Sequence, residues 1–326
     1  MKAEILALLR ANDSYLSGQE LCRRFGVSRT AVWKVINQLK EEGYEIEAVQ
    51  NKGYHLLHTP DVLSESELKS RMNTGWAGKN LHFLKETGST NIDAKRCIEN
   101  GEPHGTLVVA DRQTAGRGRR GRSWESPSGT AIYMTLALKP DFAPGKASML
   151  TLVMALAVAE AVEESCGLKA MIKWPNDIVV NRKKVCGILT EMNMETDYIQ
   201  SVVVGVGINV NQKEFPEEIR ETATSLALEK GMDIRRAQLI AAVMAHFEQA
   251  YECFLINGDL SGLKEAYEAR LVNRKERVRV LDPQGEYEGQ AEGITDTGEL
   301  LVRRKDGTVT AVYAGEVSVR GYYRYV

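Results

Sequence analysis

Cysteine is scarce in this sequence, and no cysteine lies in a local metal-binding motif. Only five occur among 326 residues, and none forms a CxxC pair or stands at zinc spacing from a histidine: Cys22, Cys97, Cys166, Cys186 and Cys253. An odd, scattered set is typical of reduced thiols and argues against a disulfide framework. We therefore expect a cytoplasmic protein.

A membrane-spanning run and a strong net charge are also missing. The longest apolar run, residues 149–159, is too short to cross a bilayer and is interpreted as a core helix. Glu4 and Arg10 interrupt the first apolar stretch, so no signal peptide is expected. The net charge of -2 is small, and any contact with DNA must therefore be local.

The length and composition fit a soluble globular protein of several domains. With 43% hydrophobic and 26% charged residues the chain can build a sizeable core, and 326 residues predict two or three domains. Thr59-Pro60-Asp61 marks one boundary, because proline ends the preceding strand and Ser64 can cap a new helix.

Residues 1–60 have the pattern of a helix-turn-helix. Two short helices are followed by Gly26, which permits a tight turn, and by Ser28, which is suited to cap a third helix. The third helix buries apolar residues at helical spacing and exposes side-chain types that reach phosphates and base edges: Ser28, Arg29, Thr30, Lys34 and Asn37. We predict that these five residues contact DNA.

A β-hairpin after the third helix would complete a winged helix. Residues 45–49 and 54–57 alternate around Asn51-Lys52-Gly53, which is typical turn chemistry. The alternative is a three-helix packing module with a solvated polar face. Local charge does not decide between them, since residues 1–60 hold eight Lys/Arg against seven Asp/Glu.

The central region contains a glycine loop filled with arginine. A strand at 106–110 leads into Asp111–Ala115 and then into GRGRRGR at 116–122. The GxGxxG spacing does not indicate a nicotinamide fold, because SWESPSG follows where a helix should open. Such a loop, disordered alone, can close on a polyphosphate or an acyl phosphate; a basic loop for nucleic acid is the alternative.

Residues after 270 predict a small β-barrel. Short strands are expected at 278–281, 287–294, 300–303 and 309–313, with turns at 282–285, 296–298 and 305–307. The complete fold is predicted to be α+β and multidomain, with a winged helix-turn-helix at 1–62, a mixed α/β catalytic domain at 63–270 and an SH3-like barrel at 271–326.

Five segments together resemble the biotin–protein ligase family in its bifunctional ligase and repressor form. They are GSTN at 88–91, DRQTAGRGRRGRSW at 111–124, KWPND at 173–177, KKVCGIL at 183–189 and GVGIN at 205–209. The resemblance implies an enzyme that forms biotinyl-5′-AMP from biotin and ATP and then transfers biotin to a lysine of a carboxyl carrier domain. It also implies repression of biotin genes with biotinyl-AMP as corepressor, by a homodimer on operator DNA.

The resemblance also implies a role for individual residues. Biotin would be bound by Ser89, Thr90, Asn91, Gln113, Arg117, Gly118, Arg119 and Lys184. ATP or the adenylate would be bound by Trp124, Lys173, Asn176, Asp177 and Asn209. The catalytic residues would be Lys184, Arg117 and Arg119, and Asp177 would contact Mg²⁺.

Two choices within the KKVC segment remain to be tested. Only one of Lys183 and Lys184 can point into a site from a strand, and the resemblance selects Lys184. Cys186 invites a covalent mechanism, but a small buried strand residue is the better interpretation.

Two other functions are compatible with parts of the pattern. One is a repressor whose ligand-sensing domain has no catalysis, which intact Lys184 and Asp177 argue against. The other is a lipoate or octanoate transferase, against which the RGR loop and KWPND favour biotin.

Overall fold

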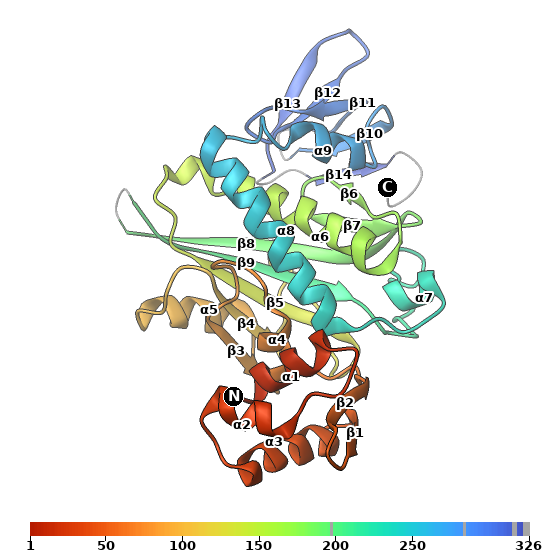
Figure 1. The fold of residues 1–326 in the computed structure, drawn as a ribbon. Coiled ribbons are helices and arrows are strands. Elements are labelled where there is room, and N and C mark those ends of the chain that lie inside the picture. Colours follow the sequence, from red (N-terminus) through yellow and green to blue (C-terminus); the bar gives the residue numbers. More distant parts are fainter. Residues whose placement is uncertain (196–197, 283–284, 315–317, 322–326) are drawn as a thin grey trace. The chain divides into compact units, whose positions relative to one another are not determined.

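The computed structural model describes residues 1–195, 198–282, 285–314 and 318–321 (Figure 1). The chain divides into two compact units. One comprises residues 1–73 with 235–241, and the other comprises residues 74–234 with 242–326.

The N-terminal unit contains the predicted helix-turn-helix. Helices α1 (Lys2–Ala11), α2 (Gly18–Phe25) and α3 (Arg29–Glu41) pack around one apolar core. Gly26 ends α2 with a φ of 64°, in the left-handed region that glycine adopts without strain. Ser28 begins α3, its Oγ accepting a hydrogen bond from the Ala31 N–H at 3.2 Å.

The predicted hairpin is also present in this unit. Strands β1 (Glu45–Val49) and β2 (Gly53–His58) pair in antiparallel fashion. Leu16 extends the pairing, because its backbone exchanges hydrogen bonds with Tyr54 at 2.8 and 3.0 Å. Gly53 is required at this crossing, since a Cβ there would lie 2.1 Å from the Leu16 carbonyl oxygen. The unit is therefore a winged helix.

Helix α4 (Glu65–Arg71) carries a buried carboxylate in the N-terminal unit. Glu67 is 1% exposed and accepts hydrogen bonds from Arg10 Nη2 at 2.8 Å, from the Tyr44 hydroxyl at 2.7 Å and from Arg71 Nε. Burial, and next the hydrogen bond to Glu67, raise the pKa of Tyr44 well above its ordinary value. Glu67 thus joins α4 to α1 and to the segment before the wing.

The larger unit is built on a seven-stranded mixed sheet. Its strand order is β3-β4-β5-β9-β8-β7-β6, from strands β3 (Leu81–Leu84), β4 (Thr106–Ala110), β5 (Ala131–Leu138), β6 (Met171–Lys173), β7 (Asp177–Val180), β8 (Lys183–Glu195) and β9 (Tyr198–Asn209). Only the β3–β4 pair is parallel among these neighbours. β5 is buried along its whole length, as its apolar sequence predicts.

Helices cover both faces of this sheet. Thr190 on β8 hydrogen-bonds Thr151 on α6 (Met149–Cys166) at 2.8 Å, whereas the next residue, Glu191, accepts a hydrogen bond at 2.8 Å from Asn91 on α5 (Thr90–Glu99). Successive side chains of a strand point to opposite faces, so α5 and α6 lie on opposite sides.

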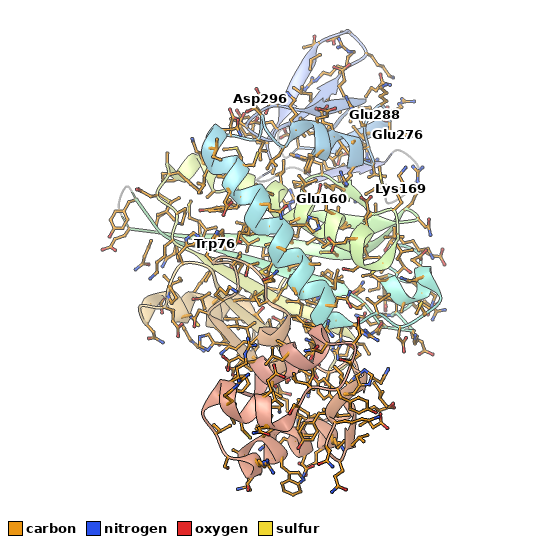
Figure 2. The ribbon with its side chains drawn as sticks, viewed as in Figure 1. Trp76, Glu160, Lys169, Glu276, Glu288 and Asp296 are labelled. Carbon is orange, nitrogen blue, oxygen red and sulfur yellow. The ribbon has the colours of Figure 1, made fainter. Side chains whose placement is uncertain are left out.

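Two helices are long and apolar enough to cross a membrane by length and composition, at 144–166 and 236–257. Helix α6 within the first is almost wholly buried against the sheet, which confirms the predicted core helix. Glu160 of α6, which Figure 2 labels, packs against two other helices of the larger unit. It lies 3.4 Å from His246 on α8 (Arg236–Asn257) and 3.7 Å from Arg270 on α9 (Lys264–Arg270). A short helix, α7 (Leu226–Lys230), follows β9.

The C-terminal residues form a five-stranded antiparallel sheet. Its order is β13-β12-β11-β10-β14, from β10 (Arg277–Leu281), β11 (Tyr287–Ile294), β12 (Leu300–Arg303), β13 (Val309–Val312) and β14 (Ser318–Gly321). The four predicted strands are confirmed, and β14 was not anticipated. Residues 283–284 of the predicted turn at 282–285 lie outside the described residues. The predicted three-part α+β fold is confirmed, while closure of this sheet into a barrel remains a prediction.

Candidate active site

A cavity of about 60 Å³ lies on the α5 face of the central sheet. It is lined by ten of the residues predicted from sequence, which come from four separate segments: Ser89, Thr90, Asn91, Gln113, Arg117, Gly118, Arg119, Trp124, Asn176 and Lys184. The structure thus brings together most of the predicted binding residues.

The first turn of α5 forms the polar end of the cavity. Ser89 stands at the N-cap, and its hydroxyl makes no capping hydrogen bond within the described chain. Gln113 Oε1 accepts from the Thr90 N–H at 2.9 Å and from the Thr90 hydroxyl at 3.1 Å, while its Nε2 donates to Ser126 Oγ at 3.1 Å. These bonds fix which way the Gln113 amide faces.

Asn91 lies at the same end of the cavity and is fixed by hydrogen bonds to residues of the central sheet. Its Nδ2 donates to Glu191 Oε2 at 2.8 Å, and its Oδ1 lies 2.7 Å from the Thr135 hydroxyl. That hydroxyl also lies 2.8 Å from Thr90 Oγ1, and its single proton serves one of the two acceptors. A side chain at Gly205 would collide with Asn91 Oδ1, because a Cβ there would lie 2.1 Å away. Asn91 lines the cavity, as predicted for a biotin-binding residue, and we expect it to act mainly by positioning its neighbours.

Asn91→Asp tests this positioning role. The variant keeps the shape of the Asn91 side chain, but it loses the N–H donor to Glu191 and brings two carboxylates together. Loss of a hydrogen bond to a charged group costs about 1.5–3 kcal/mol. On the sequence prediction that biotin binds here, we expect the KM for biotin to rise about tenfold or more, with a smaller change in kcat. Steady-state pyrophosphate release measures both constants. Asn100→Asp, at the exposed end of the same helix, is the control; equal KM values for the two variants would refute the role.

The indole ring of Trp124 packs against two glycines of the central sheet. Gly187 and Gly207 are cross-strand partners on β8 and β9. A Cβ on Gly187 would lie 2.9 Å from the Trp124 ring, and a Cβ on Gly207 would lie 2.7 Å from it. The glycines of the KKVCGIL and GVGIN segments therefore make room for one indole. Its buried Nε1 has no hydrogen-bond partner among the described residues.

The glycine-arginine loop forms one wall of the cavity. Its stem is paired, with hydrogen bonds from Trp124 N to Gly116 O at 2.9 Å and from Gly118 N to Arg122 O at 2.7 Å. Arg117, Arg120 and Arg122 are exposed, whereas Arg119 is half-buried. The predicted disorder of the loop without ligand remains a prediction.

Arg119 connects the loop to two other parts of the larger unit. Its Nη1 donates to Asn176 Oδ1 at 2.8 Å, and its Nη2 donates to the carbonyl of Ala314, after β13. Desolvation is the main influence on Arg119 and lowers its pKa from the ordinary value. The C-terminal sheet thus contributes a direct contact to the loop, which the sequence alone did not indicate.

Lys184, not Lys183, lines the cavity. Asn181 and Arg182 make the tight turn between β7 and β8 with φ values of 48° and 66°, so Lys184 follows at the second position of β8. Its Nζ lies 2.6 Å from Asp177 Oδ1 and 5.3 Å from the centre of the Trp124 ring. The backbone of Lys184 is fixed further by bonds to Thr222 and Thr224 at 2.7 and 2.9 Å.

Three predicted residues do not line the cavity. Lys173 is 7% exposed at the end of β6, and Asn209 is 7% exposed at the end of β9 with its Nδ2 donating to Thr224 O at 3.1 Å. Asp177 does not line the cavity itself, but it pairs with Lys184 at 2.6 Å and accepts a hydrogen bond from Asn176 Nδ2 at 3.2 Å, and both of these residues do. Cys186 is fully buried, and burial raises the pKa of its thiol far above its ordinary value, which supports its interpretation as a packing residue.

The predicted DNA-contacting side chains lie on the accessible side of α3. Ser28, Arg29, Thr30 and Lys34 are exposed and Asn37 is half-buried, while Val32, Val35, Ile36 and Leu39 face the core. Trp33, which the sequence analysis did not single out, is 55% exposed among them. An exposed tryptophan on a polar helix face was the signal that could have found it.

Three family descriptions match the chain. The Biotin/lipoate A/B protein ligase family matches residues 83–209, an HTH domain matches residues 2–55, and the biotin protein ligase C-terminal domain matches residues 276–320. These matches define the class of protein: a biotin/lipoate-type ligase fold that carries a helix-turn-helix.

Relatives of known name and structure extend this result. The chain is 41% identical over 312 residues to the bifunctional ligase/repressor BirA of Bacillus subtilis, covering 95% of each chain. It is 30% identical to the protein of the same name from Escherichia coli, covering 97% of this chain and 96% of that one. The biotin protein ligase of Aquifex aeolicus, solved with biotin and ATP, superimposes with a TM-score of 0.65 at 36% identity, covering 74% of this chain and 99% of that chain. This chain therefore belongs to the family of bifunctional biotin protein ligases and repressors.

Proposed function

We propose that the cavity binds biotin and ATP, joins them as biotinyl-5′-AMP and passes the biotinyl group to a lysine of a biotin carboxyl carrier domain. The observation that carries this proposal is the meeting of Lys184, the glycine-arginine loop and the polar end of α5 around one cavity. The relatives' names and the ligands of the Aquifex structure support the choice of substrates.

The ureido ring of biotin suits the polar end of the cavity. Ser89 offers a hydroxyl without a capping bond, and the Thr90 hydroxyl, which donates to Gln113, keeps at least one lone pair even when it accepts from Thr135. A ring with two N–H donors and one carbonyl needs such paired groups in a buried place. We assign Ser89, Thr90 and Gln113 to the ring, with Asn91 behind them.

Lys184 and the loop arginines suit the reacting end. In the first step the biotin carboxylate attacks the α-phosphorus of ATP and pyrophosphate leaves. In the second the acceptor amine attacks the acyl carbon and AMP leaves. Negative charge builds up on the phosphate in the first step, and Lys184 Nζ with Arg117 and Arg119 can offset it. No protein nucleophile is needed, which fits the burial of Cys186.

Adenine and magnesium take the remaining predicted residues. We assign Trp124 to cover the adenylate, with Asn209 on adenine and Lys173 and Asn176 toward the triphosphate. The carboxylate of Asp177 lies beside these residues and is already paired with Lys184. Mg²⁺ is usually held by one or two carboxylates together with substrate phosphates, so it fits here as part of MgATP, with Asp177 as its protein contact.

Mass spectrometry of an acceptor domain tests the activity. The full chain mixed with biotin, ATP, Mg²⁺ and a carboxylase carrier domain is expected to add one biotinyl group to one acceptor lysine. Lipoate or octanoate in place of biotin should give no adduct. An acceptor whose mass stays unchanged with biotin would overturn the proposal, and an adduct with lipoate would favour the transferase alternative.

The winged helix is proposed to bind operator DNA and repress biotin genes. Arg29→Ala is expected to weaken binding and to reduce the slope of log affinity against log salt by about 1, if Arg29 neutralises one phosphate. Lys69→Ala, which removes an exposed cation of α4, is the matched control. Fluorescence anisotropy on operator DNA at several salt concentrations measures both, and an unchanged slope for Arg29→Ala would remove this residue from the interface.

The ligand-bound form is proposed to be a homodimer, with the adenylate as the signal. One recognition helix binds weakly, and two half-sites a helical turn apart require two copies. Sedimentation is expected to show the mass double when biotin and ATP are added, because the adenylate orders the loop and favours the dimer. Lys184→Ala, which should make the adenylate about 10²–10³-fold more slowly, is expected to stay monomeric over the time in which the wild-type chain dimerises; an unchanged mass of the wild-type chain would contradict the proposal.

Domain limits of 1–62, 63–270 and 271–326 and a cytoplasmic location complete the proposal. A cytoplasmic setting supplies ATP, reduced thiols and access to DNA. These assignments rest on the sequence boundaries and on the scattered cysteines.

A further inference from the structure

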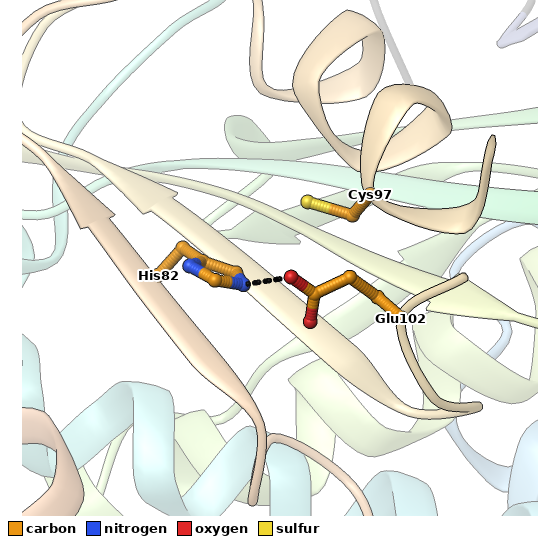
Figure 3. A group of neighbouring side chains, drawn as sticks. All are labelled: His82, Cys97 and Glu102. Atoms are coloured by element: carbon orange, nitrogen blue, oxygen red, sulfur yellow. Dashed lines mark ion pairs between the residues drawn. The ribbon is translucent and has the colours of Figure 1, made fainter. Parts of the chain in front are cut away.

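Three metal-ligating side chains meet at the far end of α5, outside the cavity. They are His82 on β3, Cys97 on α5 and Glu102 on the turn after α5, and their ligand atoms all lie within 4.8 Å of one another. Figure 3 shows the Cys97 side chain beside the facing pair of His82 and Glu102. None of the three lines the cavity.

The backbone holds two of these residues in a fixed relation. The Glu102 N–H donates to the carbonyl of Cys97 at 3.0 Å, so the turn that ends α5 places the carboxylate beside the thiol. His82 Nε2 lies 3.1 Å from Glu102 Oε1. Asn80, two residues before His82, donates from its amide to Glu102 Oε2 and, at 3.0 Å, to Thr106 Oγ1. A carboxylate oriented by an outer amide is a frequent arrangement at metal sites.

The charges around the thiol favour a cation. The thiolate of Cys97 and the carboxylate of Glu102 together would neutralise the charge of a divalent ion held between them. The ligand atom His82 Nε2 is buried and has no hydrogen-bond partner among the described residues, although the side chains of His82 and Glu102 are 41% and 28% exposed.

We propose that His82, Cys97 and Glu102 form a binding site for a divalent transition-metal ion of the zinc class. Imidazole, thiolate and carboxylate are all zinc ligands, and three protein ligands leave a fourth position for water. The thiolate excludes Mg²⁺ and Ca²⁺ as occupants, because these ions prefer oxygen. Cys97 follows His82 by 15 residues and Glu102 follows Cys97 by 5, and no local zinc motif has this spacing.

An ion bound here would restrain the segment that carries the predicted biotin residues. β3 ends at Leu84 and α5 begins at Thr90. In the sequence, the ligand His82 on β3 therefore precedes Ser89 and the ligand Cys97 on α5 follows it. Binding should stabilise this part of the larger unit, and Tm should rise with metal concentration.

Cobalt binding to the full-length, reduced and metal-free chain tests the proposal without reference to activity. Co²⁺ is expected to bind at one equivalent with a thiolate-to-metal absorption band, and Zn²⁺ should displace it while Mg²⁺ in excess should not. Cys97→Ser should abolish the band, and His82→Ala should weaken binding at least tenfold. Asn80→Ala should weaken it by about 10–100-fold, as loss of an outer partner does.

Two variants control for other ligands in the chain. Cys253→Ser removes another partly buried thiol, and His246→Ala removes an imidazole that lies between Glu160 and Glu164. Both should keep the thiolate band and the metal-dependent rise in Tm. Equal Tm values of Cys97→Ser and the wild type without metal would show that the variant folds. A band that persists in Cys97→Ser, or no band in the wild type, would overturn the proposal.

Discussion

Lys184→Ala is expected to reduce biotinyl-adenylate formation by about 10²–10³-fold, the usual cost of removing one group that stabilises transition-state charge. Lys184 Nζ is the basic group that reaches the cavity from β8, held between Asp177 at 2.6 Å and the Trp124 ring. Single-turnover pyrophosphate release measures the loss directly, since it isolates the first chemical step.

Lys183→Ala is the matched control for this prediction. Lys183 is the adjacent residue with the same charge, but it does not line the cavity, so its variant should keep most of the rate. Thermal unfolding should show that both variants fold. Comparable losses from the two substitutions would refute the assignment of Lys184 and would point to general charge in the β7–β8 turn.

Glu67→Ala is expected to destabilise the N-terminal unit by about 3–5 kcal/mol, because it leaves the buried partners of the carboxylate without a compensating charge. Glu67 is 1% exposed and faces Arg10 and Arg71, whose side chains are only 23% and 10% exposed, together with the Tyr44 hydroxyl. Urea unfolding followed by circular dichroism gives the free energy of unfolding, and repressor binding should be lost at temperatures where the ligase activity persists.

Glu65→Ala, on the same helix, gives the comparison. Glu65 pairs with Lys69 at 2.5 Å, and their side chains are 56% and 41% exposed, so removing it should cost about 0–1 kcal/mol. Glu67→Gln keeps the volume and should fall between the two. Equal stabilities of Glu65→Ala and Glu67→Ala would mean that the buried network contributes nothing.

Local chemistry explains why much of the fold was predictable from sequence. Gly26 and Ser28 set the turn of the helix-turn-helix, and both behave as their residue types require. The buried run of α6 also follows from local pattern. β14 was missed although its residues alternate between polar and apolar, because a strand of four residues gives too short a pattern to stand out.

The candidate site depended more on contacts between distant residues. Ser89, Gln113 and Lys184 were identified through segments that resemble a family, and the structure brings them to one cavity. The Arg119–Ala314 bond joins residues 195 positions apart, so no local spacing could reveal it. The pairing of Gly187 with Gly207 beneath Trp124 likewise depends on strand register, which the two motifs do not specify separately.

A crystal structure of the chain with biotin and ATP tests the central claim most directly. We expect residues 116–122 to close over the adenylate, with Lys184 Nζ within hydrogen-bonding distance of its phosphate and the ureido ring against Ser89 and Thr90. Density for the nucleotide or for biotin far from this loop would contradict the account.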